Sequence, residues 1–477
     1  MSEIKPILTP KQKALAINLD PNIYGTFAEI GAGQETVRHF FRAGGSSLTI
    51  AKAMSAYDKE YSNAIYGKEE KNRFVTQNRL KKMLRHEVGL IEERLDNEDT
   101  PHRKFFSYAN TVTTINYHKT FKGHGWVGLM FQHEADADYS EIIIHIRFKE
   151  NDSTHQQETL GNLGVNLIYG AFNYADNPRQ LINSLYDDIS IDRIEIDMIE
   201  FQGPAFEYVD NRLMSLQLVK KGMTDAVIFN SEGKPMLPAD ILYKKDVFAV
   251  RGSFRPVTLV NIDMFENGLE LFLKDTGGKP EDTVIIFEIT ISNLRATGKI
   301  DERDFLDRVD VLAKLGYTVM ISNFSEYYRL VEYFYNYNIR YLGIGMGVNN
   351  LLMVFDEEYY KHLPGGILEA FGKFFRNDMK VYLYPYKDPE THQDLCSDNL
   401  KVHDNLKELY KYFKLNNRIV DIKNHNPEYS EIYSREILSK IAQCAPGWEH
   451  QLPEGVAEMI KERGMFGYKE AIEIKEF

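Results

Sequence analysis

Three polar residues in the first half of the chain have the types that acid–base chemistry needs. Glu195 and Asp197 stand two residues apart in the alternating stretch 193–201, and His145 stands in a second alternating stretch, 141–149. In an extended strand, residues two apart point to the same face. On an inward face, the two carboxylates and the imidazole would be suited to proton transfer or cation binding. On an outward face they would form a solvated surface, and the sequence leaves both readings open.

A second group of candidate residues is cationic and belongs to the segment 243–256, the most basic stretch of an acidic chain. Guanidinium and ammonium groups next to small residues that allow close backbone approach suit an anion or phosphate clamp. The residues of the predicted clamp are Lys244, Lys245, Arg251, Gly252, Ser253 and Arg255. A surface loop whose charges pair with the surplus of carboxylates is the alternative.

A glycine loop near the N-terminus is the third candidate. The stretch 23–30 has the pattern of a strand, Gly31 and Gly33 follow it, and residues 34–41 have a helical pattern. Strand, glycine loop and helix together allow backbone N–H groups to hold a phosphate. The loop lacks the third glycine of the dinucleotide fingerprint, and the chain contains no P-loop motif. A plain tight turn is therefore the competing interpretation of Gly31 and Gly33.

The elements that would position these residues are predicted most clearly between residues 283 and 388. Apolar, β-branched runs alternate there with amphipathic segments at a spacing of roughly thirty residues, as βαβ units require. This pattern predicts a parallel sheet, whose ligand site lies beyond the carboxyl ends of the strands. Strands are predicted to start near residues 142, 193, 225, 284, 317, 341 and 381. We therefore expect an α/β fold with a TIM-like barrel, favoured over an open doubly wound sheet.

Helical additions are expected on both sides of this core. The predicted domains are a helical N-terminal region with the glycine-rich loop at 1–103, an α/β core at 104–390, and a helical C-terminal cap at 391–477. The acidic turn at 134–138 lacks the glycine and the terminal glutamate of an EF-hand, so no metal site is predicted there.

Composition limits the classes of partner. The net charge is −13 and the pI is near 5.6, which argues against non-specific binding to nucleic acid or to an anionic membrane. Two cysteines cannot form a disulfide framework, and the first twenty residues lack the apolar segment of a signal peptide. We expect a cytoplasmic protein. Because 29 tyrosines and 28 phenylalanines are generous counts and aromatic residues favour interfaces, we also expect a homo-oligomer.

Five stretches carry a resemblance to a known family, and they lie at residues 24–35, 57–58, 165–170, 210–216 and 251–256. Through them the chain resembles, over nearly its full length, a family of bacterial cytosolic proteins often labelled nicotinate-nucleotide adenylyltransferase and sometimes TonB-dependent receptor. The first label implies nucleotidyl transfer. Enzymes of that class carry two histidines in a Gly-Thr/Ser-Phe-Asp-Pro-x-His-x-Gly-His loop, and here Gly31 and Gln34 occupy those positions.

The sequence thus predicts a soluble enzyme, a transferase that acts on a nucleotide or another small phosphate-bearing ligand. Lys245, Arg251, Ser253 and Arg255 would hold the anion, and Glu195, Asp197 or His145 would transfer protons. The cofactor is unknown, although nucleotidyl transfer would call for a divalent cation such as Mg²⁺. The alternative is a non-catalytic homo-oligomeric scaffold or interaction protein.

Overall fold

The chain forms two compact units in the computed structural model, which describes residues 7–69, 73–95, 102–295, 298–388 and 391–469. The units are Met1–Asp225 and Ala226–Phe477, called here the N-terminal unit and the C-terminal unit. Each has its own sheet and its own hydrophobic core. This division differs from the predicted boundaries at 103/104 and 390/391, because strands on both sides of residue 103 belong to one sheet.

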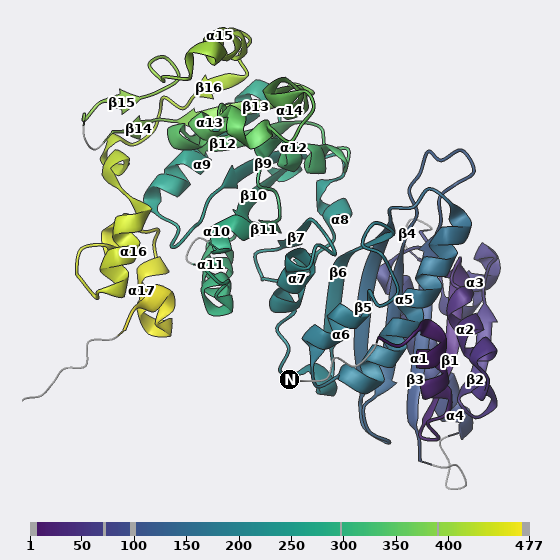
Figure 1. Cartoon of the computed structure of the whole chain (residues 1–477). Coiled ribbons are helices and arrows are strands. Elements are labelled where there is room, and N and C mark those ends of the chain that lie inside the picture. Colours follow the sequence, from purple (N-terminus) through teal and green to yellow (C-terminus); the bar gives the residue numbers. More distant parts are fainter. Residues whose placement is uncertain (1–6, 70–72, 96–101, 296–297, 389–390, 470–477) are drawn as a thin grey trace, which may run out of the picture. The chain divides into compact units, whose positions relative to one another are not determined.

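The sheet of the N-terminal unit has the strand order β2-β1-β3-β4-β5-β6 (Figure 1). The first three strands are parallel, and the last three continue as an antiparallel meander. The strands are β1 (Ile23–Gly31), β2 (Ile50–Ser55), β3 (Lys104–Thr113), β4 (His124–Gln132), β5 (Tyr139–Phe148) and β6 (Ile194–Gln202). The region expected to be helical therefore contributes two strands, one of them, β1, almost wholly buried.

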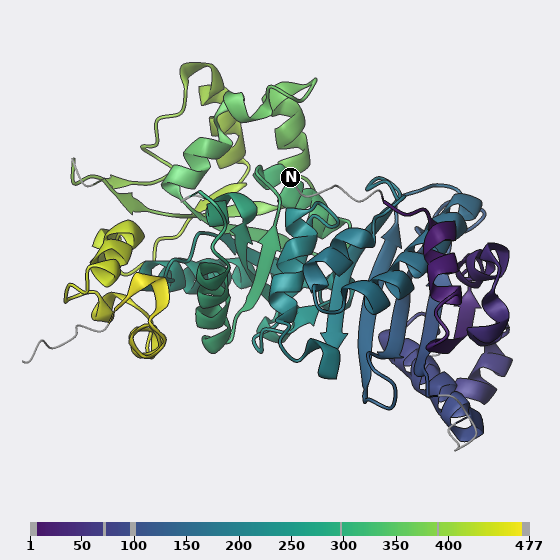
Figure 2. The ribbon, with the colours of Figure 1, turned by 60° about the horizontal axis from the view of Figure 1, so that its bottom comes forward.

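Helices cover both faces of this sheet (Figures 1 and 2). One face packs on α1, α2, α5, α6 and α7, whose apolar residues share one core with the strands. On the other face α4 lies against β1, β3 and β4, and α3 packs on α4. The helices are α1 (Pro10–Asn18), α2 (Glu35–Ala43), α3 (Lys59–Tyr66), α4 (Gln77–Leu95), α5 (Ser153–Tyr174), α6 (Pro178–Ser184) and α7 (Asn211–Lys220).

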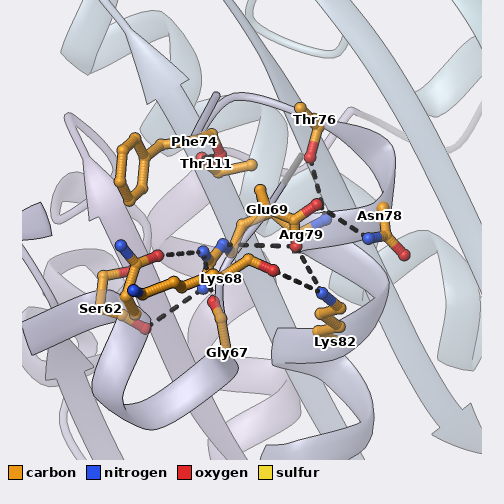
Figure 3. A network of polar contacts seen from close by, with 11 residues as sticks. Ser62, Gly67, Lys68, Glu69, Phe74, Thr76, Asn78, Arg79, Lys82 and Thr111 are labelled. Atoms are coloured by element: carbon orange, nitrogen blue, oxygen red, sulfur yellow. Dashed lines mark hydrogen bonds and ion pairs between the residues drawn. The ribbon is translucent and has the colours of Figure 1, made fainter. Parts of the chain in front are cut away.

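A buried arginine ties α4 to α3 and to the residue that follows α3 (Figure 3). The Arg79 guanidinium donates to the carbonyl oxygens of Ser62 and Gly67, at 3.2 and 2.8 Å, and to the side chain of Asn63 at 2.8 Å. Its side chain is fully buried, and burial lowers the pKa of Arg79 against the attraction of Glu69. Because three acceptors depend on this one side chain, Arg79 has a structural role in the N-terminal unit.

The C-terminal unit contains an open, doubly wound sheet. Its strand order is β16-β13-β12-β9-β10-β11-β7-β8, and the six strands from β16 to β11 are parallel. The strands are β7 (Ala226–Phe229), β8 (Pro235–Met236), β9 (Asp246–Arg251), β10 (Thr283–Thr290), β11 (Thr318–Ser322), β12 (Leu342–Gly347), β13 (Lys380–Tyr384) and β16 (Ile419–Asp421), with a separate antiparallel pair, β14 (Tyr386–Lys387) and β15 (Asp394–Leu395).

The predicted parallel ladder between residues 283 and 388 is confirmed, but the TIM-like barrel is wrong. In the described part of the chain this sheet has two free ends, β16 and β8, and the strands near 142 and 193 belong to the other sheet. Those two strands alternate because they are antiparallel strands whose two faces have different surroundings, whereas strands of a parallel barrel are apolar on both faces. The open doubly wound sheet, the second expectation, describes the C-terminal unit.

Strand β9 lies at the centre of this sheet, although the sequence indicated only a basic segment there. All six of its residues are buried, and charged residues stand at both of its ends, Asp246 and Arg251. After β9 the chain adds β10 and β11 on one side, then crosses to the other side for β12, β13 and β16. A sheet of this kind binds ligands at the carboxyl edge, where the direction of winding changes.

Helices α9 and α11 cover one face of this sheet, and α12, α13 and α14 cover the other (Figures 1 and 2). The helices are α8 (Pro238–Leu242), α9 (Leu259–Thr276), α10 (Ile291–Arg295), α11 (Glu302–Lys314), α12 (Tyr327–Tyr335), α13 (Val348–Val354), α14 (Gly366–Phe374), α15 (Lys407–Leu415), α16 (Ser434–Ala442) and α17 (Val456–Arg463). Among the described residues, no helix combines the length and the apolar character needed to cross a membrane.

Candidate functional site

A cavity of about 870 Å³ opens at the carboxyl edge of the C-terminal sheet. It is lined by residues that follow β9, β10, β11, β12 and β13, and by residues 430–438 of the C-terminal segment. Its charged lining residues are four arginines, with no carboxylate among the described residues that line it: Arg251, Arg255, Arg308 and Arg435. The predicted site edge is therefore confirmed as the location of a cavity, and its lining is positively charged.

Arg251 forms the floor of this cavity and is already engaged by a carboxylate. Its Nε and one terminal nitrogen donate to the two Glu288 oxygens at 2.7 and 3.0 Å. Glu288 also accepts a hydrogen bond from Ser322 Oγ at 2.5 Å. Although burial opposes it, the carboxylate of Glu288 raises the pKa of Arg251. Most of the charge of Arg251 is therefore used to join β9 to β10.

Arg255 and Arg308 share a single carboxylate at the side of the cavity. Asp304, in α11, accepts a bond from Arg255 Nε at 2.5 Å and another from Arg308. A further nitrogen of Arg308 donates to the main-chain oxygen of Ser253 at 3.0 Å, which holds the loop after β9 in place. Two guanidinium groups and one carboxylate leave an excess of positive charge here. This pair therefore gives that side of the cavity a net positive charge.

Two further hydrogen-bond donors beside the cavity are buried without a partner among the described residues, namely Arg308 Nε and the Tyr327 hydroxyl. Burial raises the pKa of Tyr327 to about 12, so its hydroxyl is neutral and protonated at pH 7. Buried unpaired donors are costly, and an acceptor from a ligand would relieve that cost. The N-terminus of α9 also lies at the cavity through Val260 and Asn261, and a helix N-terminus favours an anion.

The structure brings only some residues of the predicted clamp together. Arg251, Ser253 and Arg255 line one cavity, but Lys245 precedes β9 at the opposite end of the strand, about 20 Å away. Lys245 forms an ion pair with Asp282 at 2.9 Å, and Lys244 lies over the ring of Tyr243. A strand separates the two halves of the basic segment, so Lys244 and Lys245 do not belong to the anion site.

The three predicted acid–base residues gather in the N-terminal unit, on strands β5 and β6. His145 Nδ1 lies 2.6 Å from Asp197 Oδ1, and His124 Nδ1, on β4, lies 3.2 Å from His145 Nε2. Glu195 accepts a hydrogen bond from Thr224 Oγ1 at 2.7 Å. The inward-facing reading holds for His145 and Asp197, which are 2% and 3% exposed.

A bulge between β5 and β6 makes this contact possible. His145 pairs with Met198 while the next residue, Ile146, pairs with Ile196, so Asp197 is left without a partner strand residue. Such an extra residue bends the strand and re-aims its side chain, here toward His145. Strict alternation of the sequence could not have predicted this shift of register.

The electrostatics of this cluster favour a neutral His124. Burial and then His145 lower the pKa of His124 to about 4. Burial and then Asp197 raise the pKa of Glu195. In the tautomers that fit both contacts, His145 Nδ1–H donates to Asp197 and His124 Nδ1–H donates to His145 Nε2. The arrangement could relay a proton between His124 and the Asp197–His145 pair.

His124 is a member of this chain of hydrogen bonds that sequence reasoning missed. It begins a glycine-punctuated strand, and its cross-strand neighbour is Arg147 rather than His145. A histidine at the start of a strand has no distinctive sequence signal. Only the diagonal contact with His145 in the folded sheet identifies His124 as part of the cluster. Arg308 and Tyr327 were missed for the same reason, since both come from helices far along the chain from β9.

The two predicted phosphate-loop glycines lie at the end of β1 and before α2. Gly31 has φ of +86°, and a Cβ on it would lie 2.0 Å from the Val112 carbonyl oxygen; one on Gly33 would lie 2.0 Å from Asn110 Oδ1. The Val112 backbone therefore requires glycine at position 31, whereas the Asn110 side chain crowds position 33. Two acidic residues lie near this loop, the buried Glu29 and Glu35 at the start of α2. Phosphate binding at this loop stays a prediction.

The described residues offer little to a divalent cation in the cavity. Mg²⁺ binds carboxylate oxygens, whereas the two carboxylates behind the lining are taken by arginines. Elsewhere, Cys396, Asp398 and Asp421 lie within 4.8 Å of one another. Asp421 already accepts from Ser397 and Asp398 pairs with a lysine, so this group does not fit a metal well either.

Comparison with known proteins adds little. No protein-family model and no curated protein matches the chain. Solved structures of competence/damage-inducible and CinA-superfamily proteins cover about a third of this chain and most of their own length. They come from Agrobacterium tumefaciens (13% identity, 33% of this chain, 93% of that one, TM-score 0.25), Enterobacter cloacae (12%, 36%, 99%, 0.27) and Escherichia coli (15%, 34%, 90%, 0.23). Similarity this low does not extend a function to this chain, and the adenylyltransferase label stays a prediction.

Proposed function

We propose that this protein is an enzyme that binds a nucleotide or another phosphate-bearing ligand in the carboxyl-edge cavity of the C-terminal unit. The observation that carries the proposal is the charge of the lining, four arginines with no carboxylate among the described lining residues. Glu288 and Asp304 balance two of these arginines, so positive charge remains in excess. An anionic ligand would therefore bind here although the chain as a whole carries −13.

The position of the cavity supports the same proposal. It lies where the winding of the sheet reverses at β9, which is the place where open α/β sheets bind ligands. The volume of about 870 Å³ is within the range of cavities for small organic ligands. The helix N-terminus of α9 and the buried unpaired donors add a preference for acceptor groups on the ligand.

We place the activity among transferases because guanidinium groups can stabilise the charge that develops on a phosphate during group transfer. Adenylyl transfer in particular would need the histidines that Gly31 and Gln34 replace. The cavity does not fit Mg²⁺, and no step is assigned to a metal.

The test is ligand-induced thermal stabilisation in the variant Arg255→Gln. This change keeps Arg308 on Asp304, so the fold should persist while the anion site loses one charge. We expect inorganic pyrophosphate and nucleotides to raise the Tm of the natural protein and to lose most of this effect in Arg255→Gln. Lys245→Gln removes the same charge at the other end of β9 and should keep the full shift. Equal shifts in all three proteins would refute the proposal.

Self-association is the second candidate function. Helix α15 exposes two large side chains, Tyr412 and Leu415, which are 59% and 73% exposed. Neighbouring apolar side chains of this kind favour burial against a second copy of the chain. A strictly monomeric mass at micromolar concentration, measured by light scattering, would exclude this candidate without affecting the first.

A further inference from the structure

The cavity of the C-terminal unit has two chemically different ends. The end over β9 and β10 carries Arg255, Arg308 and the small polar residues after each strand. The end over β12 and β13 is walled by three tyrosines, from the end of β13, from the chain after it and from the C-terminal segment: Tyr384, Tyr386 and Tyr433. A ligand that is only an anion would leave this second end unused.

Hydrogen bonds through the hydroxyl groups hold two of these tyrosine rings. The Tyr384 hydroxyl donates to Asp263 Oδ2 at 2.6 Å, and the Tyr433 hydroxyl donates to the main-chain oxygen of Lys387 at 3.2 Å. Tyr386 and Tyr433 lie edge to face, with centroids 6.4 Å apart and an interplanar angle of 76°. Because the hydroxyl groups of Tyr384 and Tyr433 are already hydrogen-bonded, both rings are held in position and present an apolar aromatic surface to the cavity.

The rest of this end suits a planar heterocycle. Met353 and Ile432 add apolar surface, and Met353 is half exposed although it is a large apolar residue. The carboxamides of Asn349 and Asn350 stand at the same end. Each can donate and accept hydrogen bonds, which is what the edge of a nucleobase requires.

The separation of the two ends matches a ligand in which a ring and a phosphate are joined by a spacer. Adjacent strands lie about 4.8 Å apart, so β10 and β13, three steps apart in the order β13-β12-β9-β10, are separated by about 14 Å. An inorganic anion or a small sugar phosphate cannot contact both ends. A base, a sugar and a phosphate in sequence can.

We infer that the ligand is a nucleotide, with its phosphate at Arg255 and Arg308 and its base against the wall formed by Tyr386 and Tyr433. This inference rests on the proposed function and narrows it from phosphate-bearing ligands in general to those that carry an aromatic ring. Stacking on an aromatic side chain tolerates all four bases, and the two asparagines would select among them.

The experiment measures affinities by isothermal titration calorimetry on the full chain, with AMP, GMP, CMP, UMP, ribose 5-phosphate and inorganic phosphate. We expect at least one nucleotide to bind about tenfold or more tightly than ribose 5-phosphate, since a stacked base contributes that much. Tyr433→Leu should weaken the best nucleotide by about tenfold and leave ribose 5-phosphate unchanged. Arg255→Gln should weaken both ligands.

Two variants serve as controls. Tyr433→Phe keeps the ring and loses only its bond to Lys387, so it should retain nucleotide affinity within about threefold. Tyr117→Leu makes the same change at an exposed tyrosine of the N-terminal unit and should alter no affinity. Circular dichroism of Tyr433→Leu and its unchanged ribose 5-phosphate affinity together show that the variant is folded.

The outcomes of these titrations distinguish the nucleotide inference from the proposed function on which it rests. If ribose 5-phosphate binds as tightly as every nucleotide, or if Tyr433→Leu weakens both alike, the base does not contact this wall and the inference is overturned while the proposed function stands. If none of the phosphate-bearing ligands binds, both the inference and the proposed function are refuted. A nucleotide preference that Tyr433→Leu removes and Tyr433→Phe retains supports the inference.

Discussion

The guanidinium group of Arg251 and the carboxylate of Glu288 meet in two hydrogen bonds, at 2.7 and 3.0 Å, between directly paired residues of β9 and β10. Their side chains are 8% and 0% exposed. The Arg251 guanidinium also lies over the ring of Tyr327, 4.2 Å from its centroid. The ion pair therefore holds Arg251 in position at the cavity and adds no net positive charge to it.

Loss of Arg251 alone should strongly destabilise the C-terminal unit. Arg251→Met leaves the Glu288 carboxylate buried without its main partner, and we expect the free energy of unfolding to fall by about 3–5 kcal/mol. Urea denaturation followed by circular dichroism measures this. The double variant Arg251→Met/Glu288→Met removes both charges and should recover most of the loss. A single-variant loss below about 1 kcal/mol would contradict the structural role.

His124 should make the protein less stable in mild acid. Its folded pKa, about 4, lies below the ordinary value of 6.5, so the unfolded chain takes up the proton first as the pH falls. Stability should decline from pH 6.5 toward pH 4, by up to about 3 kcal/mol more than in His124→Gln. Urea denaturation at pH 7, 5.5 and 4 gives the comparison. His118→Gln, at an exposed histidine, should follow the natural protein, and a parallel pH profile for His124→Gln would rule the idea out.

Glu29 should make the protein less stable in alkaline solution, whereas His124 acts in acid. Burial, and then Glu35, raise its pKa from 4.5 to about 8. The folded state therefore favours the protonated acid, and the stability it contributes is full below pH 4.5 and is lost as the pH rises through 8. Between pH 5 and 9 the natural protein should lose up to about 4 kcal/mol more than Glu29→Gln. Thermal unfolding across this range tests it, with the exposed Glu60→Gln as control.

The packing around the glycine loop gives a matched pair of variants. Gly33→Ala places a methyl group against the Asn110 side chain and should cost about 1–3 kcal/mol. Gly89→Ala changes an exposed position of helix α4, where the added methyl group has no atom within 4 Å. This variant should be neutral or stabilise the protein by up to about 1 kcal/mol. Chemical denaturation of both variants checks the contrast. A neutral Gly33→Ala would mean that the loop can move away from β3.

Sequence patterns predicted well those elements that local periodicity defines. The runs at 284–290 and 317–321 are strands β10 and β11, parallel as expected, and the segment at 301–315 is helix α11 between them. Because parallel strands gather their carboxyl ends at one edge, this pattern also located the cavity. Strand β9 was missed because it is short and its charged ends, Asp246 and Arg251, hide a run of four apolar residues.

Which residues belong to each site depended on contacts between segments that are apart in the sequence, and no local pattern encodes such contacts. Lys245 and Arg251 are neighbours in sequence, but a strand carries them to opposite edges of the sheet. Conversely, His124 and His145 are brought together by strand pairing, and Asp197 joins them only through a bulge. Oligomeric state, location in the cytoplasm and the adenylyltransferase label stay predictions.

By itself the sequence determined that this chain is α/β, that parallel strands occur within residues 283–388, and which side chains could titrate or carry charge. Those features follow from residue type and from spacing along the backbone, which are local. The tertiary structure alone decided the strand order, the neutralisation of Arg251 by a glutamate 37 residues away, and the pairing of His145 with its two partners. Such features are settled by which surfaces bury one another best, a property of the whole packed unit rather than of any segment.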